Sequence, residues 1–313
     1  MSSSLFPTMN YPANIVSRDA TTIAPGAYLL HRNCFSRTVS RVAVRSLYGE
    51  LMCYPKPGLV SRVDNGSHED MNAPSFIRSL FALRHYFAVI ADAGSEGVPF
   101  TLLQTHGVAA EQRMLRATGG ANTHRGAIFT LGLLAAAAGW LHAHTRPLHS
   151  ATLGQTVRTL WGQSILEDLS HERRSAGISH GRIAALRYGA GGARAQAAQG
   201  FPALFDTALP VLSESLRQGC DLNRAMVQTL FTLMTTLVDT NLLYRGGPQA
   251  LAFAQRTVSD FLKEGGVYRR DWRRRAMKIH NDFVQRRLSP GGSADLLSAT
   301  VFVFLLQQEA EAH

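Results

Sequence analysis

The sequence is poor in cysteine: it has 3 in 313 residues, and no two of them form a CxxC pair. This scarcity argues against a disulfide framework and a zinc ribbon, and it fits a reducing compartment. The first residues lack a basic start followed by an apolar run, so they do not predict a secretory signal. We therefore expect a cytoplasmic protein in which residues 1–25 form a flexible tail.

Long hydrophobic runs are scarce as well. The longest run without Asp, Glu, Lys or Arg begins at residue 126, and its apolar stretch, residues 126–144, is short for a membrane span and is interrupted by Thr130 and His142. Its small residues at 135–139 are typical of a helix that packs closely inside a helical bundle. We expect no membrane association.

Runs of alternating polar and apolar residues, which would indicate strands, are nearly absent, and no repeat of solenoid length is found. Apolar residues instead recur with helical spacing. The sequence predicts an all-α fold: one bundle-like domain over residues 26–313, with glycine-rich loops that form the active site. The expected helices lie near residues 37–52, 75–93, 99–117, 125–144, 149–167, 177–188, 201–218, 222–244, 248–263, 267–288 and 294–311.

Several catalytic motifs are also missing. There is no HExxH sequence. There is also no His-Asp dipeptide, which argues against the metal-dependent helical phosphohydrolases that carry one. His142 and His144 are two positions apart on a helix, so they face in different directions and do not form a metal pair. The glycine-dense segment 188–202 lacks the GK[ST] ending of a P-loop and follows no strand. We interpret it as a flexible turn into a helix, with Arg194 reaching an anion.

Positive charge is abundant but concentrated in one place. The net charge is +10, and residues 268–288 carry eight Lys and Arg against two Asp. An apolar stripe runs through this segment at helical spacing: Trp272, Ala276, Ile279 and Phe283. This pattern predicts an amphipathic surface helix with a basic face. The alternative is a docking face for a polyanion or an acidic partner.

One unusually long loop gathers ionisable side chains. Residues 54–71, YPKPGLVSRVDNGSHEDM, contain too much Pro and Gly to form one regular element. Because clustered carboxylate and imidazole groups perturb each other's pKa, we favour a functional role for Asp70 and His68. Helix capping is the alternative explanation: Ser67 with Asp70 would form a capping box, and Asn72 would be an N-cap. The loop also carries Lys56, Asp64 and Glu69.

Two further loops place polar residues at helix starts. The segment TGGANTHRG, residues 118–126, precedes a helix whose backbone N–H groups and dipole would suit a phosphate, although a simple Asn or Thr cap explains it equally well. In SPGGSAD, residues 289–295, Ser293 is the expected N-cap of the last helix, with Asp295 in its first turn.

The segment 222–244 is apolar nearly all round, which predicts a buried helix. Polar side chains nevertheless recur on one face of it: Gln228, Thr232, Thr235 and Asp239. A buried carboxylate needs a charged partner, a metal ion or a ligand. Asp239 could pair with Arg245, but we favour a role in a site.

Carboxylates, histidines and basic residues on glycine-rich loops fit a nucleotide polyphosphate held with Mg²⁺. Beyond this chemistry, the sequence resembles the triphosphoribosyl-dephospho-coenzyme A synthase family. The resemblance rests on segments that occur in the family's order: PKPGLV with NGSHEDM (55–71), AEQRMLRATGGANTHRGAIFTLGLL (110–134), GGARAQAAQGFP (191–202), VDTNLLYRGG (238–247) and SPGGSADLL (289–297).

The resemblance implies a soluble, all-helical enzyme that transfers the triphosphoribosyl group of ATP to the 2′-hydroxyl of 3′-dephospho-coenzyme A and releases adenine. The product would be the prosthetic-group precursor for the acyl carrier subunit of malonate decarboxylase, which the composition favours, or of citrate lyase. The glycosidic bond at C1′ of the ribose is β in ATP and α in the product. This inversion favours a single displacement through an oxocarbenium-like state.

The resemblance and this chemistry together suggest roles for individual residues. A carboxylate or histidine should take the proton of the attacking hydroxyl. The candidates are Asp70 or His68 first, then Asp64 or Glu111. Asn122 or His124 would assist the departure of adenine.

Mg²⁺ would be held by Asp239 together with Asp70 or Asp295. Phosphates would be held by Lys56, Arg125, Arg194 and Arg245. The remaining substrate contacts are expected from Ser67, Thr123, Asn241, Gly291, Gly292 and Ser293.

Two departures from the family pattern are visible. Gln196 stands about where an acidic residue is expected, so we assign it no role, and Arg125 replaces a Lys while keeping the charge. Two other functions remain as alternatives: an inactive scaffold that docks the acyl carrier subunit, and a basic protein that binds nucleic acid through residues 268–288. We expect no nucleic-acid partner, because the basic residues are confined to one helix. The acyl carrier subunit and the downstream prosthetic-group transferase are the protein partners we consider.

Overall fold

Every regular element in the described part of the chain is a helix. The computed structural model of the protein describes residues 25–172, 187–188 and 191–311, and these residues contain no strand. The all-α prediction is therefore confirmed. In chain order the elements are α1 (Pro25–Met52), α2 (Ala73–Leu83), α3 (Tyr86–Ser95), α4 (Phe100–Thr118), α5 (Arg125–Ala143), α6 (Ser150–Glu172), α8 (Gly192–Ala198), the π-helix η1 (Ala203–Ala208), α9 (Leu209–Arg217), α10 (Leu222–Thr236), α11 (Thr240–Lys263), the 3₁₀-helix η2 (Gly266–Tyr268), α12 (Trp272–Gln285) and α13 (Gly291–Glu311).

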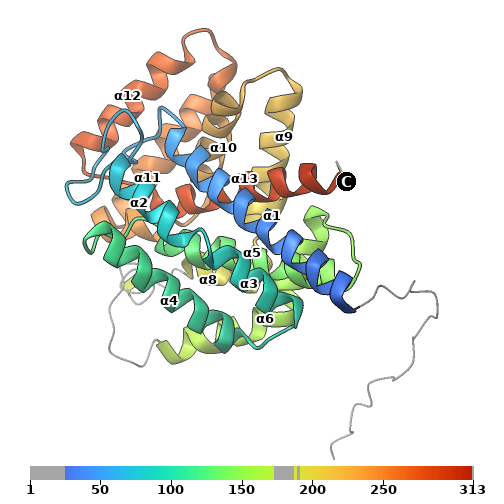
Figure 1. The fold of residues 1–313 in the computed structure, drawn as a ribbon. Helices are drawn as coiled ribbons and strands as arrows, with labels where there is room; N and C mark the ends of the chain where they lie inside the picture. Colours follow the sequence, from blue (N-terminus) through green and yellow to red (C-terminus); the bar gives the residue numbers. More distant parts are fainter. Residues whose placement is uncertain (1–24, 173–186, 189–190, 312–313) are drawn as a thin grey trace, which may run out of the picture.

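The apolar helix α5 lies at the centre of the fold (Figure 1). It contacts α1, α3, α4, α6, α8 and α13. By length and composition it would pass as a membrane span, but 72% of its apolar stretch is buried inside the protein. The helix α3 approaches it closely because Gly139 has no side chain. A Cβ there would lie 1.9 Å from the carbonyl oxygen of Ala91.

The last described helix, α13, packs against the first, α1, so the two ends of the described chain lie together. It packs against α1, α5, α9 and α10. At the surface, the guanidinium groups of Arg41 and Arg45 on α1 lie 2.9 and 3.2 Å from the carboxylate of Glu309 on α13. The N-terminal ends of α5, α11 and α13 all reach the same cleft, which is described below.

The basic helix α12 has the predicted amphipathic form. Ala276, Ile279 and Phe283 are buried, whereas the side chain of Arg274 is 83% exposed. Phe253 on α11 packs against Phe283, with ring centroids 5.7 Å apart. The apolar stripe therefore holds α12 against α11 (Figure 1). The basic face of α12 remains in solvent.

The helix boundaries differ from the sequence prediction at several places. The expected helix 75–93 is two helices, because the chain turns at residues 84–85 between α2 and α3. The glycine-dense segment 188–202 contains the short helix α8, which was not among the expected helices because glycine disfavours helix. A break between residues 244 and 248 is confirmed by the non-helical backbone of Gly246 and Gly247 within α11. The expected helix 177–188 lies almost entirely outside the described residues.

The predicted helix 222–244 is wrong in a way that matters for function. Helix α10 ends at Thr236, and Leu237 takes an extended conformation. Asp239 then begins α11 as its N-cap, and its side chain accepts a hydrogen bond from the Asn241 N–H. The physical reason is the strong preference of Asp for the N-cap position. Asp239 is therefore not the fourth polar residue on one helical face.

Candidate active site

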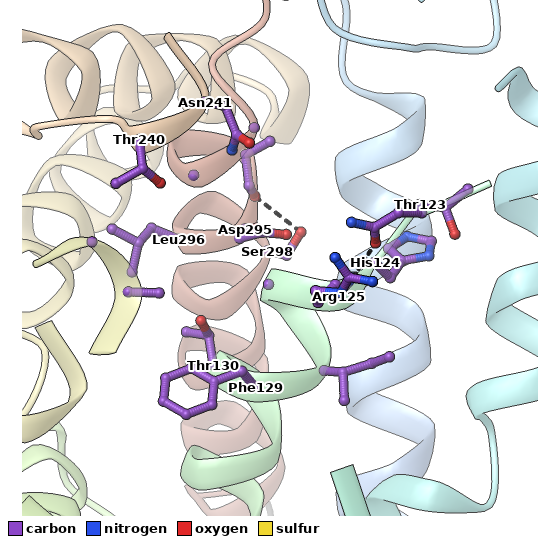
Figure 2. Close-up of a pocket in the computed structure, with 18 of the residues that line it drawn as sticks. Thr123, His124, Arg125, Phe129, Thr130, Thr240, Asn241, Asp295, Leu296 and Ser298 are labelled. Atoms are coloured by element: carbon purple, nitrogen blue, oxygen red, sulfur yellow. Dashed lines mark hydrogen bonds between the residues drawn. The ribbon is translucent and has the colours of Figure 1, made fainter. Parts of the chain in front are cut away.

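One large cleft collects the loops that are far apart in the sequence. Its volume is about 920 Å³, which is within the range of small-molecule sites. Its walls come from the 59–71 loop, the start of α5, residues 191–196, residues 237–245 and the start of α13. Figure 2 shows Asp295 on α13 between Asn241 on one side and the start of α5 on the other.

Three helices begin at this cleft, which favours anions. The first residue of α5 is Arg125, α11 starts after its N-cap Asp239, and α13 starts at Gly291. The first N–H groups of a helix have no partner within the helix, and the helix dipole is positive there. Three guanidinium groups, those of Arg125, Arg194 and Arg245, also line the cleft. This combination is suited to phosphate groups.

Asp239 connects the starts of two of these helices. Its side chain is buried, and its Oδ2 accepts hydrogen bonds from the Ser293 N–H at 2.8 Å and from Ser293 Oγ at 2.9 Å. Its Oδ1 accepts the Asn241 N–H at 2.9 Å. Burial raises the pKa of Asp239, while the hydrogen bonds from Ser293 and Asn241 oppose that rise. Asp239 thus fixes the start of α13 against the start of α11.

Asp295 is the most perturbed carboxyl group in the cleft. Burial raises the pKa of Asp295 well above its usual value, and the nearby charges of Glu50 and Asp239 raise it further. The Ala127 N–H, at the start of α5, opposes this rise. A Cβ on Gly126 would lie 1.9 Å from Asp295 Oδ2, so only glycine leaves room for this carboxyl group. Strongly perturbed carboxyl groups in a cleft are typical of functional sites.

Comparison with known proteins identifies the family. A family model described as ATP:dephospho-CoA triphosphoribosyl transferase (CitG) matches residues 36–313. The chain belongs to this family. It is therefore an enzyme, a transferase. No solved structure was found to match it.

Similar curated proteins cover most of the chain. A probable 2-(5''-triphosphoribosyl)-3'-dephosphocoenzyme-A synthase of Acinetobacter calcoaceticus is 38% identical over 268 residues, which are 86% of this chain and 90% of the relative. The 2-(5''-triphosphoribosyl)-3'-dephosphocoenzyme-A synthase of Pectobacterium atrosepticum is 37% identical over 304 residues, 95% of this chain and 98% of the relative. The protein of that name from Klebsiella pneumoniae is 39% identical over 272 residues, 83% and 87% of the two chains.

Lys56 does not face the cleft as we expected. Its side chain is completely buried, and its Nζ donates hydrogen bonds to the carboxylate of Glu50 and, at 2.6 Å, to the Glu50 carbonyl oxygen. Its amino group is therefore engaged inside the protein rather than free for a phosphate. Glu50, by contrast, lines the cleft, and it was not predicted as a site residue because it lies within an ordinary helical pattern.

Asp64 and Ser67 also lie outside the cleft lining. Asp64 accepts a hydrogen bond from the hydroxyl of Tyr54 at 2.9 Å and lies 3.3 Å from Nε2 of His280. Ser67 Oγ donates to the carbonyl oxygen of Leu288 at 2.6 Å. These contacts hold the 54–71 loop against the segment that follows α12, so both residues shape the site indirectly.

The expected cap at Asn72 is confirmed, but with a different partner. The Asn72 side chain accepts the Ser75 N–H, and Ser75 Oγ accepts the Asn72 N–H, which together form a capping box. Ser67 and Asp70 are not part of it. Ser293 is likewise not the N-cap of the last helix, because α13 begins two residues earlier.

His68 and Asp70 both line the cleft, but their environments differ. His68 Nε2 lies 2.8 Å from Ser289 Oγ, and its Nδ1 accepts a hydrogen bond from Arg245 at 3.2 Å. Burial and then the charge of Arg245 lower the pKa of His68. Both ring nitrogens are occupied, which makes His68 a poor proton acceptor. The side chain of Asp70 is 65% exposed at the mouth of the cleft.

The start of α5 contains both paired and unpaired polar groups. Arg125 Nε donates to Glu111 Oε1 at 2.6 Å, so these two candidates form an ion pair at the cleft wall. Asn122 Oδ1 caps α5 by accepting the Arg125 N–H at 3.1 Å. In the part of the chain that the structure describes, Thr123 Oγ1 and His124 Nε2 are buried without a hydrogen-bond partner. Such groups in a cleft wall indicate a ligand contact.

The α8 residues make specific contacts as well. Arg194 pairs with Asp168 on α6 and lies over the ring of Phe129 at 5.7 Å. Gln196 also lines the cleft, and its Oε1 accepts the Ala203 N–H at 3.1 Å. This bond connects α8 to the π-helix η1. Gln196 therefore has a clear structural contact, which the family pattern did not predict.

No group of three or more His, Cys, Asp or Glu side chains in the described residues forms a ready-made metal site. Burial and then the charge of Glu50 are the larger causes of the raised pKa of Asp295, but the charge of Asp239 also contributes, so these two acidic side chains lie near each other in the cleft. A cation would relieve that repulsion. Mg²⁺ keeps several waters and usually takes only one or two protein carboxylates together with substrate phosphates, so these residues fit it.

Proposed function

We propose that this protein transfers the 5-triphosphoribosyl group of ATP to the 2′-hydroxyl of 3′-dephospho-CoA, releasing adenine. The observation that carries the proposal is the composition of the cleft. Three helix starts and the guanidinium groups of Arg125 and Arg194 suit polyphosphates, while Asp239 and Asp295 suit a cation or a positively charged transition state. Both substrates that the relatives' names imply are rich in phosphate.

The transfer breaks the bond between C1′ of ATP and adenine and forms a bond between C1′ and the 2′-oxygen of the acceptor. In the net reaction, the proton lost by the acceptor hydroxyl ends on the released adenine. We assign Asp70 as the group that takes the proton of this hydroxyl, because its carboxylate is exposed at the cleft mouth whereas His68 has both nitrogens occupied. Asp295 faces the middle of the cleft, where a carboxylate would stabilise the positive charge that develops on the ribose (Figure 2).

Mg²⁺ is the metal we propose for this site. Asp295, with Asp239 or Asp70, would hold it, and it would neutralise part of the triphosphate charge. Arg125, Arg194 and the starts of α11 and α13 are the groups that would contact phosphate oxygens. Arg245 instead keeps the 54–71 loop in place, since it also donates to the carbonyl oxygens of Ser67 and Arg287.

We also propose the cytoplasm as its location and malonate decarboxylase, rather than citrate lyase, as the enzyme that uses the product. The alanine- and arginine-rich composition supports this second choice. The basic face of α12 is a suitable surface for an acidic partner such as the acyl carrier subunit or the next transferase. Supplying the product with each of the two apo acyl carrier subunits and their transferases would distinguish the two pathways.

The direct test is a chromatographic assay. Purified protein is incubated with ATP, Mg²⁺ and 3′-dephospho-CoA, and free adenine and a product heavier by one triphosphoribosyl group are measured. We expect both to appear together and to vanish when the acceptor or Mg²⁺ is omitted. ATP binding without any release of adenine would contradict the proposed function and would favour a scaffold.

A further inference from the structure

The histidine at the start of α5 has a buried partner that neither the sequence patterns nor the relatives indicate. His124 is 4% exposed, and its Nδ1 lies 2.6 Å from Oγ of Ser79 on α2. Ser79 is completely buried and does not line the cleft, whereas His124 does. Among the described residues, the other ring nitrogen of His124 has no partner. One side of this imidazole is therefore fixed, and the other is left for a ligand.

The contact with Ser79 defines which nitrogen carries the hydrogen. Within the described chain, the Ser79 hydroxyl has His124 Nδ1 as its partner and no other. A buried hydroxyl hydrogen that is not donated costs about 1–3 kcal/mol, so Ser79 should donate to Nδ1. Nδ1 is then the acceptor, and Nε2 carries the N–H. We assign this tautomer from the hydrogen-bond network.

The imidazole is also kept neutral. Burial lowers the pKa of His124 to about 3, and the charge of Lys56 contributes to this shift. Since Lys56 is itself held by Glu50, this positive charge is fixed near the ring. His124 therefore presents a neutral N–H donor at neutral pH, rather than a cation that would attract a phosphate.

The wall around His124 suits a flat, uncharged ring. Phe76 packs edge-on against the imidazole with ring centroids 4.8 Å apart, and Val60 and Met71 belong to the same small apolar cluster. All three of these apolar residues line the cleft. The residue before His124 carries the second unpaired group, Oγ1 of Thr123, and it also lines the cleft. An apolar wall with two neutral polar atoms matches a purine, which has ring nitrogens that accept hydrogen bonds.

The position of this wall relative to Asp295 indicates that the purine bound there is the adenine that leaves ATP. Gly126, two residues after His124, lies directly against the carboxyl group of Asp295. If Asp295 faces the ribose during transfer, the base attached to C1′ lies toward the start of α5. A donor to a purine ring nitrogen would help there, because the base gains electron density as the bond breaks.

We infer that the Nε2–H of His124 donates a hydrogen bond to N3 or N7 of the adenine that leaves ATP, and that Ser79 is a positioning residue that fixes the tautomer of His124. This inference rests on the proposed function. It adds a binding site for the leaving base and a role for a residue outside the cleft.

The first experiment measures binding without acceptor, so that no transfer is needed. Calorimetry gives the Kd of ATP, 7-deaza-ATP and 3-deaza-ATP for the wild type and for His124→Phe. We expect His124→Phe to weaken ATP by about 3- to 10-fold, the value of one hydrogen bond. For the analogue that lacks the contacted nitrogen, the variant should cause no further loss. The inference would be overturned if the effects of His124→Phe and of the base modification were additive for both analogues. It would also be overturned if His124→Phe weakened the binding of 3′-dephospho-CoA instead of ATP.

The double variant Ser79→Ala/His124→Phe is the control for a folding defect. Replacing both partners by apolar groups leaves no buried hydroxyl unpaired and should be nearly neutral for stability. If His124→Phe alone does not fold, the same binding cycle is measured with this double variant. A matched control is Ser46→Ala, which removes another buried hydroxyl, bonded at 2.8 Å to the Ala43 carbonyl oxygen away from the cleft.

The role of Ser79 is tested by NMR with ¹⁵N-labelled histidine. The signals of His124 are identified by their loss in His124→Phe. In the wild type we expect a protonated Nε2 and an unprotonated Nδ1, and we expect Ser79→Ala to abolish this preference and lower kcat, while Ser46→Ala does neither. A protonated Nδ1 in the wild type, or a tautomer unchanged by Ser79→Ala, would contradict the inference.

Failure of the inference and failure of the proposed function give different results. If the wild type releases adenine but the binding cycle is additive, only the contact with His124 is wrong. If the wild type never releases adenine, the proposed function is wrong, and the binding cycle and the NMR tautomer still decide whether His124 holds a purine. With transfer intact, His124→Phe should lower kcat by about 100-fold, the usual cost of one transition-state hydrogen-bond donor.

Discussion

The proposed role of Asp70 gives the sharpest test of the active site. The change Asp70→Asn keeps the shape of the side chain and removes its ability to take a proton. Because this side chain is 65% exposed, we expect the free energy of unfolding to change by less than about 0.5 kcal/mol. For a domain of this size, that corresponds to a Tm change below about 2 °C. The rate, in contrast, should fall by about 10²- to 10⁴-fold, the usual contribution of a general base.

Glu69 supplies a matched control one residue away. Its side chain is 89% exposed, lies 3.4 Å from Arg287 and does not belong to the cleft lining. Glu69→Gln removes the same charge from the same loop, so it should leave both rate and Tm close to the wild type. The assay is adenine release under saturating ATP, Mg²⁺ and acceptor, with Tm measured on the same samples. A wild-type rate in Asp70→Asn would remove Asp70 from the mechanism.

The same variant separates the two roles considered for Asp70. If this carboxylate takes the proton of the hydroxyl, the lost rate should not return when Mg²⁺ is raised. If it helps to hold the metal ion, higher Mg²⁺ should restore part of the rate, because weaker binding is overcome by concentration. The dependence of the rate on Mg²⁺ therefore distinguishes a base from a ligand.

Three further changes test other parts of the site. Lys56→Met should leave Glu50 buried without its partner and lower the free energy of unfolding by about 3–5 kcal/mol, measured by urea denaturation; an unchanged midpoint would contradict the buried pair. Because the folded state raises the pKa of Asp295, the contribution of this group to stability is fully present below its unfolded pKa of about 3.9 and is lost as pH rises through its raised folded pKa. Asp295→Asn should therefore raise the Tm at pH 7 without Mg²⁺, flatten its dependence on pH, and abolish adenine release; a lower Tm at pH 7 would refute this. Gly126→Ala should displace the Asp295 carboxyl group and cost about 1–3 kcal/mol with loss of activity, whereas Gly49→Ala, which meets nothing within 4 Å on α1, should be neutral or stabilising.

The helical architecture could be predicted because apolar periodicity reports directly on helices packed in a core. The amphipathic form of α12 and the break at Gly246 and Gly247 followed from the same local signals. The end of α10 did not, because the apolar pattern continues through residues 237–244 while the backbone changes direction at Leu237. The N-cap preference of Asp239 was the competing signal.

The site was harder to predict because its contacts join distant residues. The loops that line the cleft were correctly selected by their glycines and ionisable groups, and they meet in one place. Whether a side chain enters the cleft or is bonded beneath it depends on tertiary contacts. Lys56 is withdrawn by Glu50, and Asp64 by Tyr54 and His280. No spacing in the sequence connects Ser79 to His124, which are 45 positions apart.

The bond between Asp239 and Ser293 has a consequence for synthesis on the ribosome. The two residues are 54 positions apart, and the second lies in α13, the last described helix. A nascent chain that already contains α1 to α11 therefore still lacks one wall of the cleft and the partner of Asp239. Glu309, which pairs with Arg41, emerges later still. Under the proposed function, a bound nucleotide would contact the start of α13, so it would stabilise only chains in which this helix has docked.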